Sequence, residues 1–121
     1  MALCPLDQLK SMVASGDWAY ASEHCKRKVR AYDLTDEDVE KIVGSLRPEP
    51  FRIGGNFRGE FGPAQTGDFG VLNADAYLVW FDHVEHELCR PDEGVLFYVK
   101  LALYSDDENN LCVVVRLHPS S

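Results

Sequence analysis

Four polar residues near the end of the chain have side-chain types that can act together on a bound phosphate. Tyr98 and Lys100 alternate with apolar residues, so both fall on one face of a predicted strand. Arg116 and His118 have the same spacing in the next apolar stretch. Imidazole transfers protons near neutral pH, and guanidinium can hold phosphate in a bidentate manner. A solvent-facing Tyr/Lys pair and a terminal histidine without a function are the alternative interpretation.

Two further groups of basic residues could contact a polyanion. Residues 26–28 read Lys-Arg-Lys and are followed by Arg30, which gives a local positive cluster or a solvated helix face. Arg52 and Arg58 lie in a stretch rich in Gly and Phe. They could form a platform for phosphates and stacked bases, although packing of the Phe residues into the core is the simpler explanation.

A metal site is the other chemistry that the sequence raises. His83, His86 and Cys89 follow one another at steps of three, with Asp82 nearby. On a helix these side chains could face one way and hold zinc. The stretch is typical of the end of a strand, however, where steps of three alternate between faces. We therefore expect no metal and no cofactor.

The charge of the chain limits the classes of function. Its 121 residues carry 12 Lys and Arg against 20 Asp and Glu, a formal net charge of −8. Residues 1–58 hold nine basic and nine acidic side chains, whereas residues 59–121 hold three and eleven. A uniformly basic nucleic-acid binder, with a pI above about 9, is excluded. Contact with RNA or DNA would require a local site, because the overall field repels a polyanion.

The location of the protein is predicted from what the sequence lacks. No apolar run approaches the roughly 18–20 residues that span a bilayer, and the first residues do not resemble a secretory signal. The four cysteines lie far apart and form no paired motif. We therefore expect reduced thiols, a cytoplasmic location and no membrane partner.

Apolar stripes at helical spacing predict helices over residues 6–13, 18–31 and 35–46. Gly16 closes the first, and Ser22 or Asp17 can cap the second. Thr35 and Asp38 form a capping box at the start of the third.

Residues 76–85, 95–104 and 111–117 are rich in β-branched and aromatic side chains and predict strands. The stretch before them is rich in Gly and Phe, which indicates an ordered loop or an irregular hairpin. The order of elements predicts a single α+β domain over residues 1–121, with the helices packed on one face of an antiparallel sheet. Its parts are a helical segment (1–47), a Gly/Phe-rich insertion (51–75) and antiparallel strands (76–118).

Several segments, in this order and spacing, resemble the motility quorum-sensing regulator (MqsR) toxins, which have a RelE/HigB-like fold. The similar segments are residues 6–16 (LDQLKSMVASG), 34–36 (LTD), 42–46 (IVGSL), 80–84 (WFDHV), 97–101 (FYVKL) and 113–118 (VVVRLH). A related group of this fold also shows H-x-x-x-R followed by T-x-x-D-V, which corresponds here to His24–Lys28 and Thr35–Val39. The sequence departs from the pattern at Phe81, where the toxins have glutamine, and in lacking their polybasic character.

The resemblance implies a small endoribonuclease that cleaves messenger RNA without metal and is neutralised by a cognate antitoxin. The implied catalytic residues are Tyr98, Lys100 and His118. Arg52, Arg58 and Arg116 would then bind the substrate. Because residues 59–121 are strongly acidic, a non-catalytic protein of the same fold that binds a basic partner is the alternative.

Overall fold

The computed structural model describes residues 5–50 and 56–120, except for the side chains of 48–50 and 56–61. The helices are α1 (Leu6–Ala14), α2 (Glu23–Ala31) and α3 (Asp36–Gly44). The strands are β1 (Trp18–Tyr20), β2 (Arg47–Pro50), β3 (Asn56–Gln65), β4 (Val71–Asp82), β5 (Glu87–Leu88), β6 (Val95–Ser105) and β7 (Asn110–Pro119). In the part of the chain that is described, no helix is long and apolar enough to cross a bilayer.

The strands form one curled sheet in the order β1-β7-β6-β4-β3-β2, with β5 paired to β4 off this path. The central pairs β3–β4, β4–β6 and β6–β7 are antiparallel. Both outer pairs, β1–β7 and β2–β3, are parallel. The predicted α+β class is confirmed, but the prediction of a purely antiparallel sheet is wrong at its two edges.

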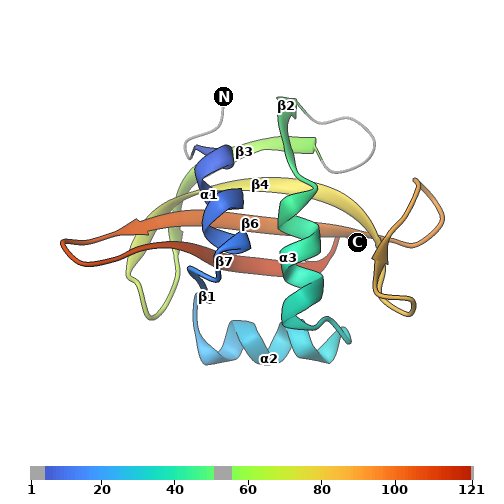
Figure 1. Cartoon of the computed structure of the whole chain (residues 1–121), viewed down its shortest axis with the longest axis horizontal. Helices are drawn as coiled ribbons and strands as arrows, with labels where there is room; N and C mark the ends of the chain where they lie inside the picture. Colours follow the sequence, from blue (N-terminus) through green and yellow to red (C-terminus); the bar gives the residue numbers. More distant parts are fainter. Residues whose placement is uncertain (1–4, 51–55, 121) are drawn as a thin grey trace.

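Helices α1 and α3 cover one face of the sheet, and α2 runs along its β1–β7 edge (Figure 1). The side chains that β6 turns toward the helices, Phe97, Val99 and Leu101, are fully buried. Between them, Tyr98 and Lys100 are half-buried on the opposite face. The period-two pattern of β6 therefore separates a core face from a polar face, as the sequence predicts.

The start of α3 agrees with the predicted capping box. The Thr35 hydroxyl accepts a hydrogen bond from the Asp38 N–H, and the Asp38 carboxylate accepts one from the Thr35 N–H. The first helix ends as expected, because Gly16 has φ +82° just beyond α1.

The predicted second helix begins too early. Trp18 and Tyr20 lie in β1, and α2 starts after Ser22, whose hydroxyl caps it by accepting from the Cys25 N–H. The Trp18 indole donates to Glu40, and the Tyr20 hydroxyl donates to Asp36, both on α3. A three-residue strand is too short to show an alternating pattern, and Trp18 also fits the apolar stripe of the predicted helix.

Of the predicted insertion, residues 56–65 and 71–75 lie in strands of the sheet. β3 and β4 pair as a hairpin with an irregular register between Phe57 and Phe61, and β4 begins at Val71 rather than residue 76. The chain leaves β4 after Asp82, so the predicted continuation of that strand to residue 85 is wrong.

Candidate functional site

The sheet register brings the four polar residues of β6 and β7 together. Tyr98 is the cross-strand partner of His118, and Lys100 is the partner of Arg116. All four therefore lie on the sheet face opposite α1 and α3. The alternation in the two strands predicts this arrangement, and the register confirms that they are neighbours.

The His118 imidazole is held at one nitrogen and on one ring face. Its Nδ1 lies 2.8 Å from the carbonyl oxygen of Pro119, and a carbonyl can only accept, so Nδ1 carries a proton. In the neutral ring the lone pair is then on Nε2. The Tyr98 ring stacks on the imidazole, with centroids 5.2 Å apart and planes inclined by 16°. His118 is thus oriented as a proton acceptor through Nε2.

A bulge in β7 sets the direction of these side chains. Lys100 pairs with Arg116, but Leu101 pairs with Val114, so Val115 is an extra residue. Bulges change the direction of a strand and often occur beside functional sites. Next to the bulge, Arg116 is exposed, whereas its neighbours Val115 and Leu117 are buried.

Helix α2 is attached to this bulge through Cys25. The thiol donates to the carbonyl oxygens of Val114 (3.3 Å) and Val115 (3.6 Å). Burial raises the pKa of the Cys25 thiol, so the sulfur keeps the proton that these contacts need. The thiol therefore positions α2 beside the polar part of β7.

A cleft of about 480 Å³ lies between α2 and β7, and we call it the α2–β7 cleft. The α2 side contributes Ser22, His24, Cys25, Lys28 and Tyr32, and β7 contributes residues 115–118. The end of β3 adds Gln65 and Thr66.

The β3–β4 turn reaches the α2–β7 cleft because it docks on the start of α2. The Asp68 N–H donates to the Ala21 carbonyl oxygen. The ring of Phe69 packs against that of Tyr104 on β6, with centroids 4.9 Å apart. Gly67 has φ +91°, and a Cβ built there would lie 3.3 Å from the Cβ of Ser22. The turn thus approaches α2 at a point where glycine meets both a conformational and a steric requirement.

The lining of the cleft is cationic in an acidic protein. Lys28 and Arg116 are its fixed cations, His24 and His118 also line it, and none of its described lining residues is Asp or Glu. His24 and Lys28 are four residues apart on α2, so they lie on one face of that helix. The sequence marks Lys28 as part of a basic cluster, but its closeness to β7 depends on tertiary packing.

The remaining predicted residues lie elsewhere. Tyr98 and Lys100 are beside Arg116 and His118 on the sheet, but they do not line the cleft. Arg52 is outside the described residues, and Arg58 is described only in its backbone, within β3.

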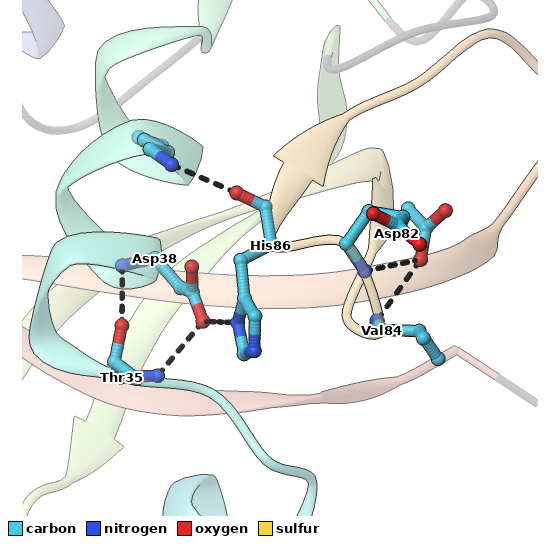
Figure 2. Close-up of polar contacts among 7 residues, drawn as sticks. Thr35, Asp38, Asp82, Val84 and His86 are labelled. Atoms are coloured by element: carbon cyan, nitrogen blue, oxygen red, sulfur yellow. Dashed lines mark hydrogen bonds and ion pairs between the residues drawn. The ribbon is translucent and has the colours of Figure 1, made fainter.

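His86, in the turn after β4, belongs to a different contact. The His86 Nδ1 lies 2.7 Å from the buried carboxylate of Asp38, and the Lys41 ammonium donates to the His86 carbonyl oxygen (Figure 2). His83 and His86 lie in a turn rather than on a helix, and Cys89 follows β5. Among the described residues, no three His, Cys, Asp or Glu side chains are grouped to hold a metal ion.

Comparison of the chain with models of protein families, with curated proteins and with solved structures finds no match. The chemistry of the α2–β7 cleft is therefore the observation from which a function can be argued.

Proposed function

We propose that the chain is a small endoribonuclease that binds messenger RNA in the α2–β7 cleft and cleaves it by acid/base chemistry that needs no metal. The proposal includes a cytoplasmic location, a RelE-like arrangement and neutralisation by a cognate antitoxin, as the resemblance to the MqsR toxins implies. The observation that supports it most is the cationic, carboxylate-free lining of the cleft in a protein of net charge −8.

Two cations in the cleft are suited to a phosphate group. Arg116 offers a guanidinium that can donate two parallel hydrogen bonds to phosphate oxygens, and Lys28 offers a charge from the opposite wall. Lys100, the cross-strand neighbour of Arg116, adds positive charge on the same sheet face. These groups would stabilise the charge that grows on the phosphate oxygens during cleavage.

His118 is suited to remove the proton of the attacking 2′-hydroxyl. Its Nδ1–H is engaged with the Pro119 carbonyl oxygen, which leaves Nε2 as the acceptor. Tyr98 acts in this proposal by stacking on the ring and holding its orientation. General base catalysis by a positioned group contributes about 10²- to 10⁴-fold to a rate.

The test is cleavage of a fluorescent single-stranded RNA by the purified chain in the presence of EDTA. We expect wild type to cleave, His118→Ala to be slower by about 10²- to 10⁴-fold, and Lys100→Ala to be impaired as well. Arg47→Ala is the matched control, because Arg47 is an exposed cation of β2 that does not line the cleft. In cells, wild type expressed without a partner should stop growth, and the double variant His118→Ala/Lys100→Ala should relieve this.

The acidic residues favour one alternative function. Asp107 and Glu108 are exposed in the turn between β6 and β7, and a non-catalytic protein could use such a surface to bind a basic partner. Intact RNA and normal growth at high expression, together with a stable complex with a basic protein, would favour this alternative and contradict the nuclease.

A further inference from the structure

Cleavage by a 2′-hydroxyl requires a second proton transfer that His118 does not provide. The attacking 2′-oxygen and the departing 5′-oxygen lie on opposite sides of phosphorus in an in-line displacement. A base on the side of the nucleophile therefore needs a separate acid on the side of the leaving group.

The lining of the cleft offers few candidates for this acid. Arg116 does not give up a proton, and Lys28 is better suited to hold charge. The Cys25 thiol is already bonded to the carbonyl oxygens of Val114 and Val115. His24, on the wall opposite His118, provides the second imidazole among the described lining residues.

We propose that His24 is the proton donor to the 5′-oxygen. This inference rests on the proposed nuclease function and assigns the second half of its chemistry. His24 is the second residue of α2, and the Ser22 cap fixes where that helix begins. It lies one helical turn before Lys28, so a phosphate held by Lys28 would have the imidazole at its side.

His24 shares the cleft with two fixed cations, Lys28 and Arg116. The titratable and charged groups that share the cleft are Cys25, Lys28 and Tyr32 from α2, and Arg116 and His118 from β7. β3 contributes the neutral Gln65 and Thr66. The fixed charges of Lys28 and Arg116 would attract a phosphate into the cleft that His24 lines.

The proposed step balances as follows. The 2′-hydroxyl gives its proton to Nε2 of His118, and the 2′-oxygen forms a bond to phosphorus. The bond from phosphorus to the 5′-oxygen breaks, and its electron pair takes the proton of the His24 imidazolium. The products are a 2′,3′-cyclic phosphate and a 5′-hydroxyl, with one proton moved from His24 to His118.

A substrate in which sulfur replaces the bridging 5′-oxygen separates this role from the others. Thiolate leaves without being protonated, so an acid is no longer needed. We expect His24→Ala to slow cleavage of ordinary RNA by about 10²- to 10⁴-fold and to be close to wild type on the 5′-thio substrate. His118→Ala should be slow on both substrates, whereas the control Arg47→Ala should cleave both at the wild-type rate. His24 is exposed, so its replacement leaves the core intact.

The pH profile gives a second readout. Wild type should show a bell-shaped dependence, and His24→Ala should lose the fall in rate on the alkaline side. Equal loss on both substrates, or a wild-type rate on ordinary RNA, would overturn the role of His24 while leaving the nuclease intact. No cleavage of either substrate by wild type would refute the proposed function and this inference with it.

Discussion

Asp38 joins the start of α3 to the turn after β4, and its replacement should destabilise the fold. Its side chain is 1% exposed, and its Oδ2 lies 2.9 Å from the Thr35 N–H donor and 2.7 Å from Nδ1 of His86 (Figure 2). The perturbation is Asp38→Ala. It removes both contacts but leaves the backbone N–H of residue 38 available to the Thr35 hydroxyl.

The size of the effect follows from these two contacts. A hydrogen bond to a charged group contributes about 1.5–3 kcal/mol, and the loss of an acceptor by the partly buried Thr35 N–H adds to the cost. The side chain of His86 is 44% exposed, so water weakens its interaction with Asp38. The contribution of this contact is therefore at the low end of that range. Removal of the buried carboxylate also relieves some desolvation. We expect Asp38→Ala to lower the free energy of unfolding by about 2–3 kcal/mol at neutral pH.

The effect should depend on pH in a defined direction. Burial raises the pKa of Asp38, but hydrogen bonds from Thr35 and the interaction with His86 outweigh it, so the pKa lies below its ordinary value. A lowered pKa means that the stability from this carboxylate is fully present above the unfolded-state pKa, about 3.9. It is lost as the pH falls below this value through the folded-state pKa. The difference between wild type and Asp38→Ala should therefore narrow in acid.

Urea unfolding followed by circular dichroism, at several pH values from 7 to 3, measures this difference. Glu37→Ala is the matched control, because Glu37 is an exposed acid in the same helical turn. It should lose no more than about 1 kcal/mol, the usual size of an acid's interaction with the helix dipole. A difference below about 0.5 kcal/mol for Asp38→Ala, or one that widens in acid, would refute the reasoning.

Two further predictions concern the α2–β7 cleft. Arg116→Ala should weaken binding of single-stranded RNA by about tenfold, and it should reduce the slope of log affinity against log salt by about 0.7. Fluorescence anisotropy across a salt series measures both quantities. An unchanged slope would show that Arg116 does not contact the RNA. Gly67→Ala should lower the free energy of unfolding by more than Gly70→Ala in thermal or urea unfolding. Both glycines have positive φ, but a Cβ at Gly67 would lie 3.3 Å from the Cβ of Ser22, whereas a Cβ at Gly70 would have nothing within 4 Å. Equal losses of stability in the two variants would contradict the docking of this turn on α2.

The parts of the fold that depend on local patterns could be predicted from sequence. Alternation in β6 and β7 is a property of neighbouring residues, so the shared face of Tyr98 and Lys100, and that of Arg116 and His118, could be read directly. The capping box of Thr35 and Asp38 is likewise contained within four residues.

The parts that failed depend on contacts between distant segments. β1 exists because Trp18 and Tyr20 find partners in β7, about ninety residues later, and nothing in their local sequence indicates a parallel pair. The same holds for the candidate site. His24 and Lys28 can be placed on one helix face from their spacing, but their position beside β7 depends on contacts such as that of the Cys25 thiol with the bulge.

Several of the carboxylates behind the acidic excess of the chain have a structural role in turns. Asp106 accepts hydrogen bonds from the Glu108 and Asn109 N–H groups, and Asp82 accepts from those of Val84 and Glu85. These two turns lie at opposite ends of the sheet (Figure 1).

Salt at physiological strength screens exposed charges beyond about 8 Å, so the cations of the α2–β7 cleft dominate the field that a bound phosphate experiences. The net charge still slows the approach of RNA at low salt. The salt slope of wild type therefore has two opposing contributions. Salt weakens the contact between the cleft cations and phosphate, and it also relieves the repulsion between RNA and the net negative charge. The difference in slope between wild type and Arg116→Ala mainly reflects the lost contact with phosphate. It therefore tests the cleft better than the slope of either protein alone.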